Sequence, residues 1–518
     1  MRKEFVVRSS SRSRPILAGA LAVFLCTLPL LANASVLVSG SARTDFNWLR
    51  RAPLNAFGVE DGATNLEGWF DFRGQAEKWD ASVRLRIHES AGISDDPPQE
   101  EIDRRHLAYR TPDLEIVAGH FYTTFGNGLV LRTIEQRFVT LNRSDRAFNL
   151  DRNIDGVMVK LALPQVEGSV ISGRPGRTGL SESVVGGAIE SRSDDLLQGV
   201  DLNLTQFDQV TAGVSFLRAE LADPQGGSNF EGREEQDLVS YRLGGNLDAV
   251  SGEFEYAEAR PTGALRDELF LGRGIARYFR VESGVGDLAV SLEGKSYKDF
   301  DFFPYNQPPT LVRTHESALL NRATHVLLPD DERGIQFEAL YVPEPFTSFV
   351  FNVATADDSE YSKDRKFREV FASGRTEVEE LGAGRLALGW SRDRIKFVEN
   401  RYTAALELEG FVSEEDSIIL DLEVQASESL FGDSTIQLAQ ISFSRAGLGT
   451  FSITGEHSNS RTLEKRDWLF AALDLSLSDS VDLTLGYGSR PAGLVCSGGF
   501  CFVSPEFDGA EFRLLSRF

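Results

Sequence analysis

Apolar and polar side chains alternate with a period of two through most of this chain, and that alternation limits the folds it can adopt. In residues 418–425 (IILDLEVQ) the even-numbered positions are all aliphatic, whereas the odd-numbered positions carry Ile419, Asp421, Glu423 and Gln425. Residues 83–88, 200–205 and 481–488 follow the same pattern. Such segments are typical of β-strands that have one apolar and one polar face.

The spacing of these segments predicts how the strands are connected. Short breakers such as residues 284–287 and 343–345 alternate with longer polar stretches such as residues 221–235. Short turns that alternate with long loops are typical of an outer-membrane β-barrel. We therefore predict an all-β, transmembrane, antiparallel up-and-down β-barrel over residues 35–518, with about 20 strands and a range of roughly 18 to 24. Alternation alone does not distinguish it from a soluble β-sandwich or β-helix.

The N-terminus predicts export. Residues 1–14 carry five basic residues and one acid, an apolar stretch follows, and Ala32-Asn33-Ala34 forms a small-residue cleavage site. This is the pattern of a signal peptide over residues 1–34, with a membrane anchor as the alternative. Cleavage leaves 49 basic and 77 acidic residues, a net charge of −28. Such a charge argues against nucleic acid as a partner.

The C-terminus favours the membrane barrel over the soluble alternatives. In the last predicted strand Phe512, Leu514 and Phe518 share one face, and Glu511 and Arg513 point the other way. A terminal phenylalanine after such a strand resembles the signal that the outer-membrane barrel-assembly machinery reads. We therefore expect that machinery and outer-membrane lipid to be partners, and Phe518 to be the assembly signal.

Cys496 and Cys501 are the two cysteines of the predicted mature chain. An exported, oxidising compartment makes a disulfide between them the default expectation. If the last strand runs inward from outside the cell, the pair lies in an extracellular loop and holds that loop folded. A metal site is the weaker reading, because nearby His or Cys partners are absent. We predict no metal and no cofactor.

Three stretches resemble a family of outer-membrane β-barrel proteins catalogued as a domain of unknown function. They are residues 118–137 (AGHFYTTFGNGLVLRTIEQR), 305–325 (YNQPPTLVRTHESALLNRATH) and 493–518 (GLVCSGGFCFVSPEFDGAEFRLLSRF). The first fits a G-x-F-Y-x-x-F-G-x-G-L-x-L-R pattern followed by E-x-R. The resemblance implies the barrel fold and brings no substrate or catalytic residue.

Residues 118–152 break the two-residue rhythm and are predicted to fold into the lumen. From Phe121 to Arg152 the chain carries five arginines, so it is locally basic within an acidic protein. We expect Arg132 and Arg137 to face passing solute, with Glu135 nearby and with Tyr122 and Phe125 packing the segment onto the wall. The alternative is that these arginines pair with lumen acids for structure alone.

Residues 305–325 form the second possible lumen insert. Pro308 and Pro309 exclude a central strand, and the stretch after them is predicted to make about two helical turns with Leu319 and Leu320 on one side. The pore candidates in this segment are His315, Asn321 and Arg322. His315 and His325 are ten residues apart, a spacing that matches no recognised metal motif.

The function classes that remain are a channel and a scaffold. The sequence contains neither a G-x-S-x-G elbow nor an H-E-x-x-H motif, so we predict no enzyme activity. Strand-like sequence begins at Val36, which leaves no room for the plug domain of a TonB-dependent receptor. We predict a porin-like channel for small polar or anionic solutes. The alternative is a non-conducting scaffold of a surface or secretion complex.

Overall fold

A computed structural model provides the fold of the chain. It describes residues 36–52, 58–94, 98–139, 148–175, 179–180, 195–207, 209–221, 234–261, 273–300, 308–311, 313–325, 331–357, 366–497 and 500–518. The predicted signal peptide, residues 1–34, lies outside the described residues.

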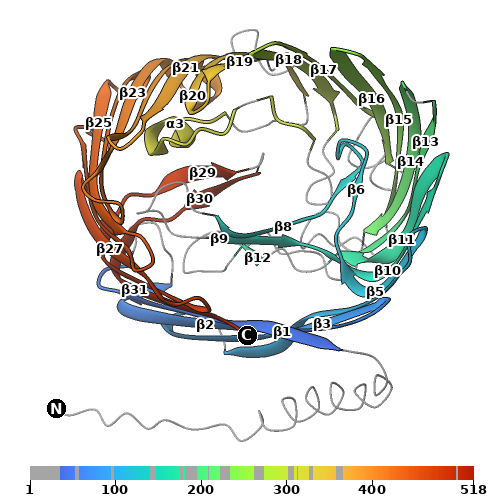
Figure 1. Cartoon of the computed structure of the whole chain (residues 1–518), viewed down its shortest axis with the longest axis horizontal. Coiled ribbons are helices and arrows are strands. Elements are labelled where there is room, and N and C mark those ends of the chain that lie inside the picture. Colours follow the sequence, from blue (N-terminus) through green and yellow to red (C-terminus); the bar gives the residue numbers. More distant parts are fainter. Residues whose placement is uncertain are drawn as a thin grey trace, which may run out of the picture.

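A single 24-stranded sheet closes on itself to form a barrel, and every pairing in it is antiparallel (Figure 1). Each wall strand pairs with the wall strands that precede and follow it along the chain. The last strand, β31, pairs with β1 to complete the ring. The wall strands are β1 (Leu37–Leu49), β2 (Val59–Ala76), β3 (Trp79–Ile93), β4 (Gln99–Arg110), β5 (Leu114–Phe121), β10 (Ile154–Leu163), β11 (Val166–Pro175), β13 (Leu196–Phe207), β14 (Val210–Leu221), β15 (Glu234–Leu247), β16 (Val250–Pro261), β17 (Gly274–Val285), β18 (Leu288–Lys298), β19 (Asp331–Glu344), β20 (Thr347–Asp357), β21 (Lys366–Val378), β22 (Gly382–Asp393), β23 (Val398–Phe411), β24 (Asp416–Ser429), β25 (Ser434–Arg445), β26 (Gly449–Ser458), β27 (Asp467–Ser478), β28 (Val481–Arg490) and β31 (Phe507–Arg517).

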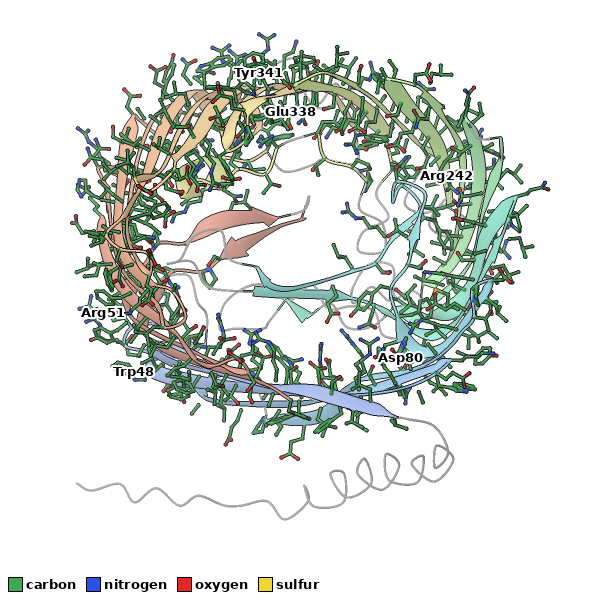
Figure 2. All side chains as sticks on the ribbon, in the orientation of Figure 1. Trp48, Arg51, Asp80, Arg242, Glu338 and Tyr341 are labelled. Atoms are coloured by element: carbon green, nitrogen blue, oxygen red, sulfur yellow. The ribbon has the colours of Figure 1, made fainter. Side chains whose placement is uncertain are left out.

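The strands form because their side chains separate cleanly between the two sides of the wall. On β24 the side chains of Asp421, Glu423 and Gln425 are buried inside, whereas Leu422 and Val424 are 40% and 43% exposed outside. Figure 2 shows the same division on β19, where Glu338 lies on the inner side and Tyr341 on the outer side. The predicted β-barrel is therefore confirmed, and its 24 strands lie at the upper end of the predicted range.

The two rims of the barrel differ in the length of their connections. At one rim, which we call the short-turn rim, turns of two to four residues join pairs such as β2–β3, β15–β16 and β27–β28. Asp248 in the β15–β16 turn has a φ of 51°, the left-handed conformation that such tight turns use. The opposite, long-loop rim carries the longer connections, including those after β5, β18 and β28. All of the inward-folded segments described below come from that rim.

Four of the long connections send elements into the ring (Figure 1). The first holds β6 (Thr124–Phe125), β7 (Leu131–Arg132), β8 (Ile134–Val139) and β9 (Phe148–Arg152). The second, between β11 and β13, holds β12 (Gly179–Leu180), which pairs with β9. The third holds the helix α3 (Ala318–Arg322), and the fourth is a hairpin of β29 (Gly493–Ser497) and β30 (Phe500–Ser504). A short 3-10 helix, η2 (Arg394–Lys396), joins β22 to β23 at the same rim.

Across the described residues, no helix is long and apolar enough to cross a membrane.

Candidate functional site

Residues 122–135, which we call the inner segment, pack onto the inside of the wall through a hydrophobic core. Phe125, Leu129 and Leu131 are completely buried and belong to one cluster with Leu197 of β13 and Leu217 of β14. A glycine in the wall makes this contact possible: a Cβ atom added to Gly199 would lie 2.7 Å from Phe125 Cε2. The inner segment therefore fills one side of the barrel with apolar side chains.

The tip of the inner segment is held by a charged group of the wall. The backbone N–H of Asn127 donates a hydrogen bond to Glu255 Oε2 of β16 at 2.8 Å. Gly126 adopts a φ of 56° directly over Arg242, and Arg242 in turn pairs with Asp201 at 2.6 Å. Figure 2 shows Arg242 on the inner side of the wall.

The other end of the inner segment docks on arginines of the wall through Glu135. Its carboxylate accepts hydrogen bonds from Arg84 Nη2 at 3.3 Å and from Arg104 Nη1 at 3.2 Å. Arg104 also donates to the hydroxyl of Tyr122, and its guanidinium lies 5.3 Å from the centre of that ring. The structure thus brings Tyr122 and Glu135 together on Arg104, which sequence reasoning did not single out.

Residues 308–325, which we call the strap, run along the inner wall from β18 to β26. Near its start the hydroxyl of Tyr297 donates a hydrogen bond to the carbonyl of Pro309 at 2.9 Å. Arg313 pairs with Glu338 of β19, and His315 Nε2 lies 3.1 Å from Glu369 Oε1 of β21. These three contacts hold the first part of the strap against β18, β19 and β21.

The helix of the strap is shorter than predicted, and its leucines diverge. α3 has five residues, and Glu423 of β24 accepts hydrogen bonds from the N–H groups of Ala318 and Leu319 at 2.8 and 2.7 Å. Leu319 packs with Leu438 of β25, whereas Leu320 belongs to a separate cluster on β21–β23. The expectation of two turns with both leucines on one side is wrong, because Leu319 and Leu320 pack against different parts of the wall.

The last residues of the strap sit among buried charges. The Asn321 amide donates to the carbonyl of His315 at 3.0 Å, and Arg322 Nη1 donates to Glu456 of β26 at 2.7 Å. His325 Nε2 lies 3.1 Å from Glu332 of β19, and its Nδ1 lies 3.6 Å from Asp393 of β22. Burial lowers the pKa of His325, but its bonds to Asp393 and Glu332 outweigh that effect and leave the pKa raised. Among the described residues no group of three or more His, Cys, Asp and Glu residues could hold a metal ion.

A polar cavity of about 880 Å³ lies inside the wall between the inner segment and the short-turn rim. Strands β1 to β5, β10 and β31 line it, and Tyr122 and Glu135 border it from the inner segment. Its lining includes four acidic residues and five basic ones. The basic residues are Arg73, Arg104, Arg110, Lys160 and Arg517. The cavity therefore has a slight excess of basic groups in a chain with a net charge of −24.

The structure describes Arg132 and Phe518 fully, but not the side chains of Arg137 and the two cysteines. Burial lowers the pKa of Arg132, whose side chain covers Gly128, and the side chain of Arg137 lies outside the described residues. Cys496 and Cys501 are directly opposite in the register of β29 and β30, but their side chains also lie outside the described residues, so the disulfide stays a prediction. Phe518 exchanges two backbone hydrogen bonds with Gly40 of β1.

The hairpin that carries the two cysteines comes from the long-loop rim and reaches the strap. Figure 1 shows β29 and β30 crossing the interior of the ring, and β29 contacts α3. Gly493 lies against Arg322, since a Cβ atom added there would be 3.0 Å from Arg322 Cδ. The hairpin therefore rests on the strap, and the expectation that the cysteine pair holds an extracellular loop folded stays a prediction.

Fold and interior together define the class: a closed, antiparallel β-barrel whose inner face is charged and whose long-loop rim sends segments inward. Within that class the chain belongs to the family of unknown function DUF6029, whose model matches residues 15–355. The match includes the inner segment and the strap and ends before the hairpin of β29 and β30. The predicted resemblance to a family of unknown function is confirmed at that level.

Three solved structures are remotely similar to this chain. The translocation pore of the P pilus usher (PapC) is 10% identical with a TM-score of 0.46, covering 93% of this chain and 99% of that chain. OccK3 (OpdO) of Pseudomonas aeruginosa is 14% identical with a TM-score of 0.42, covering 76% and 96%. OccK5 (OpdH) of the same organism is 10% identical with a TM-score of 0.37, covering 93% and 97%. No curated protein matches the chain.

Proposed function

We propose that the chain is an outer-membrane β-barrel that passes small polar or anionic solutes through its lumen. The observation that carries this proposal is the reversed polarity of the closed wall. Charged side chains such as Glu67 and Arg86 are buried inside, whereas Leu243, Phe349 and Leu388 are about half exposed outside. A wall with an apolar outside and a charged inside suits lipid around it and water within it.

The polar cavity supports passage rather than a sealed interior. Its volume of about 880 Å³ lies within the range of roughly 300–1,000 Å³ that pockets for drug-sized molecules occupy. Charged and hydroxyl-bearing side chains line it, and these exchange hydrogen bonds with a hydrated solute at little cost. In this proposal the protein is a channel and not an enzyme.

Fractionation and bilayer recording test the proposal together. We expect the protein, made with its own signal peptide, to be found with outer membranes and to require detergent for extraction. In planar bilayers it should give discrete conductance steps. Replacing residues 122–152 with a short Gly-Ser linker from Phe121 to Asn153 should raise the conductance, because the inner segment occupies part of the lumen.

The inward segments favour a second candidate, a non-conducting scaffold. The strap and the inner segment are both fixed to the wall by partly buried ion pairs and by apolar clusters, which would also serve to seal a barrel. If the wild-type protein and the linker variant are both folded and both silent in bilayers, the scaffold replaces the channel. Recovery of the mature protein as a soluble monomer without detergent would exclude both.

A further inference from the structure

We propose that the polar cavity binds a small, hydroxyl-bearing solute with a single negative charge, and that Lys160 is the residue that binds that charge. The inference rests on the proposed function, because it names a class of solute for the same lumen. The site lies between the inner segment and the short-turn rim.

A row of alternating charges crosses the inner wall and ends at Lys160. Arg73 of β2 pairs with Asp80 of β3, and Arg110 of β4 lies 3.3 Å from the same carboxylate. Arg110 Nε also donates to Glu115 Oε1 of β5 at 2.7 Å. Glu115 is the direct cross-strand partner of Lys160 on β10. On the far side of β10, the partner of Lys160 is Ser169, which carries no charge.

The acids of the cavity are already engaged by arginines. Asp80 and Glu115 belong to the row, Asp71 accepts a hydrogen bond from Arg84 at 2.8 Å, and Glu135 accepts one from Arg104 at 3.2 Å. The remaining basic group of the lining, Arg517, pairs with Asp482 at 2.7 Å.

Lys160 is the exception among the basic residues of the lining. Within the described part of the chain it has neither an ion pair nor a hydrogen bond, because Glu115 turns to Arg110 instead. Its ammonium is therefore the cationic group that an incoming solute meets without first displacing an acid. A single unpaired ammonium group is neutralised by a solute that carries one negative charge.

The other lining groups indicate the rest of the solute. The hydroxyls of Ser39, Ser82 and Tyr122 border the cavity and offer neutral hydrogen bonds, while Val117 and Met158 supply apolar surface beside Lys160. Apolar neighbours exclude water and strengthen the attraction between opposite charges. A small hydroxy acid has both features, and its carboxylate would be placed at Lys160.

Lactate and its neutral analogue lactamide are the probes for binding, measured by saturation-transfer NMR on the full mature chain in detergent micelles. We expect lactate to bind and lactamide to bind at least tenfold more weakly. Lys160→Gln should weaken lactate binding by about tenfold, the effect of losing roughly one charged hydrogen bond. Lys160→Arg should retain it, and Lys78→Gln, in the β2–β3 turn outside the cavity lining, should not change it.

The binding test and the channel test fail separately. Equal binding of lactate and lactamide, or unchanged lactate binding in a folded Lys160→Gln protein, overturns the site whether or not the barrel conducts. In bilayers, lactate should reduce the chloride current of the wild type and have a weaker effect on Lys160→Gln. A protein that binds lactate through Lys160 but never conducts keeps the site and refutes the channel.

Discussion

Arg322 in the strap and Glu456 on β26 join two parts of the chain that are 134 residues apart: Arg322 Nη1 lies 2.7 Å from one carboxylate oxygen and 2.9 Å from the other. The Glu456 side chain is only 6% exposed, so this ion pair is largely shielded from water. The pair fixes the end of α3 to the wall, and the hairpin of β29 and β30 rests on the same arginine through Gly493.

We predict that Arg322→Ala destabilises the strap by about 2 kcal/mol, the usual cost of removing a hydrogen bond to a charged group. Amide hydrogen exchange should accelerate in the strap, while the wall strands opposite β24–β26 stay protected. Arg461→Ala, in the exposed β26–β27 connection, is the matched control and should change neither exchange nor the melting temperature. Equal effects of the two substitutions would show that the pair does not hold the strap.

Docking of the strap should depend on pH through His325. Its imidazole faces Glu332 and Asp393, and those acids also pair with Lys295 of β18 and Lys396 of η2. Because the folded pKa of His325 is raised above its unfolded value of about 6.5, its stabilisation is complete below that value. The stabilisation is lost as the pH rises through the folded pKa. Burial lowers the pKa of Lys396, so that lysine also loses charge more readily at high pH.

The measurement is hydrogen exchange of residues 313–325 between pH 6 and pH 9, corrected for the intrinsic rate. We expect local protection to fall as pH rises, and His325→Gln to remove most of that pH dependence. His457→Gln is the control, since His457 is half exposed on the outer wall. A pH dependence that survives in His325→Gln would assign the effect to another group.

The wall could be predicted from the sequence, and the interior could not. Strand side chains such as those of Glu423 and Leu422 alternate because the pleat requires it, so a local pattern reports which face each occupies. The hydrogen bond from the N–H of Ala318 in α3 to Glu423 could not be predicted in this way. It joins residues 105 positions apart, and the two-residue alternation within a strand carries no information about it. The same holds for the pairing of Glu135 with Arg104.

Phe125→Ala should loosen the inner segment. Phe125 is fully buried beside Gly199, so truncation leaves a cavity that the rigid wall cannot fill. We expect a loss of about 3 kcal/mol in the free energy of unfolding, and noisier, larger conductance steps if the barrel is a channel. Phe351→Ala, on the outer face of β20, is the matched control and should cost much less. Unaltered stability in Phe125→Ala would mean that the segment is not anchored by this residue.

We expect Cys496 and Cys501 to be joined, since the register of β29 and β30 places them opposite one another. Alkylation of unreduced, denatured protein should leave both unlabelled, and reduction should expose two thiols. Because the hairpin contacts α3, replacing both with serine should also increase exchange in the strap. Two reactive thiols before reduction would rule out the bond.

Phe518 is predicted to act in two separable ways, through its backbone and through its ring. Its N–H donates to the carbonyl of Gly40 at 3.0 Å, and its carbonyl accepts from the Gly40 N–H at 2.8 Å, so the last residue extends the β1–β31 seam. The ring lies 6.0 Å from that of Phe72 and is 62% exposed. Deleting Phe518 removes both bonds, at about 1 kcal/mol each, whereas Phe518→Ala keeps them. We therefore expect the deletion to lower the temperature at which the folded form is lost on gels, and Phe518→Ala to leave that temperature nearly unchanged.

Both variants should slow assembly into the membrane in a pulse-chase experiment, because both lack the ring that resembles an assembly signal. If Phe518→Ala assembles at the wild-type rate, the ring is not that signal, and the role of the residue is limited to closing the seam.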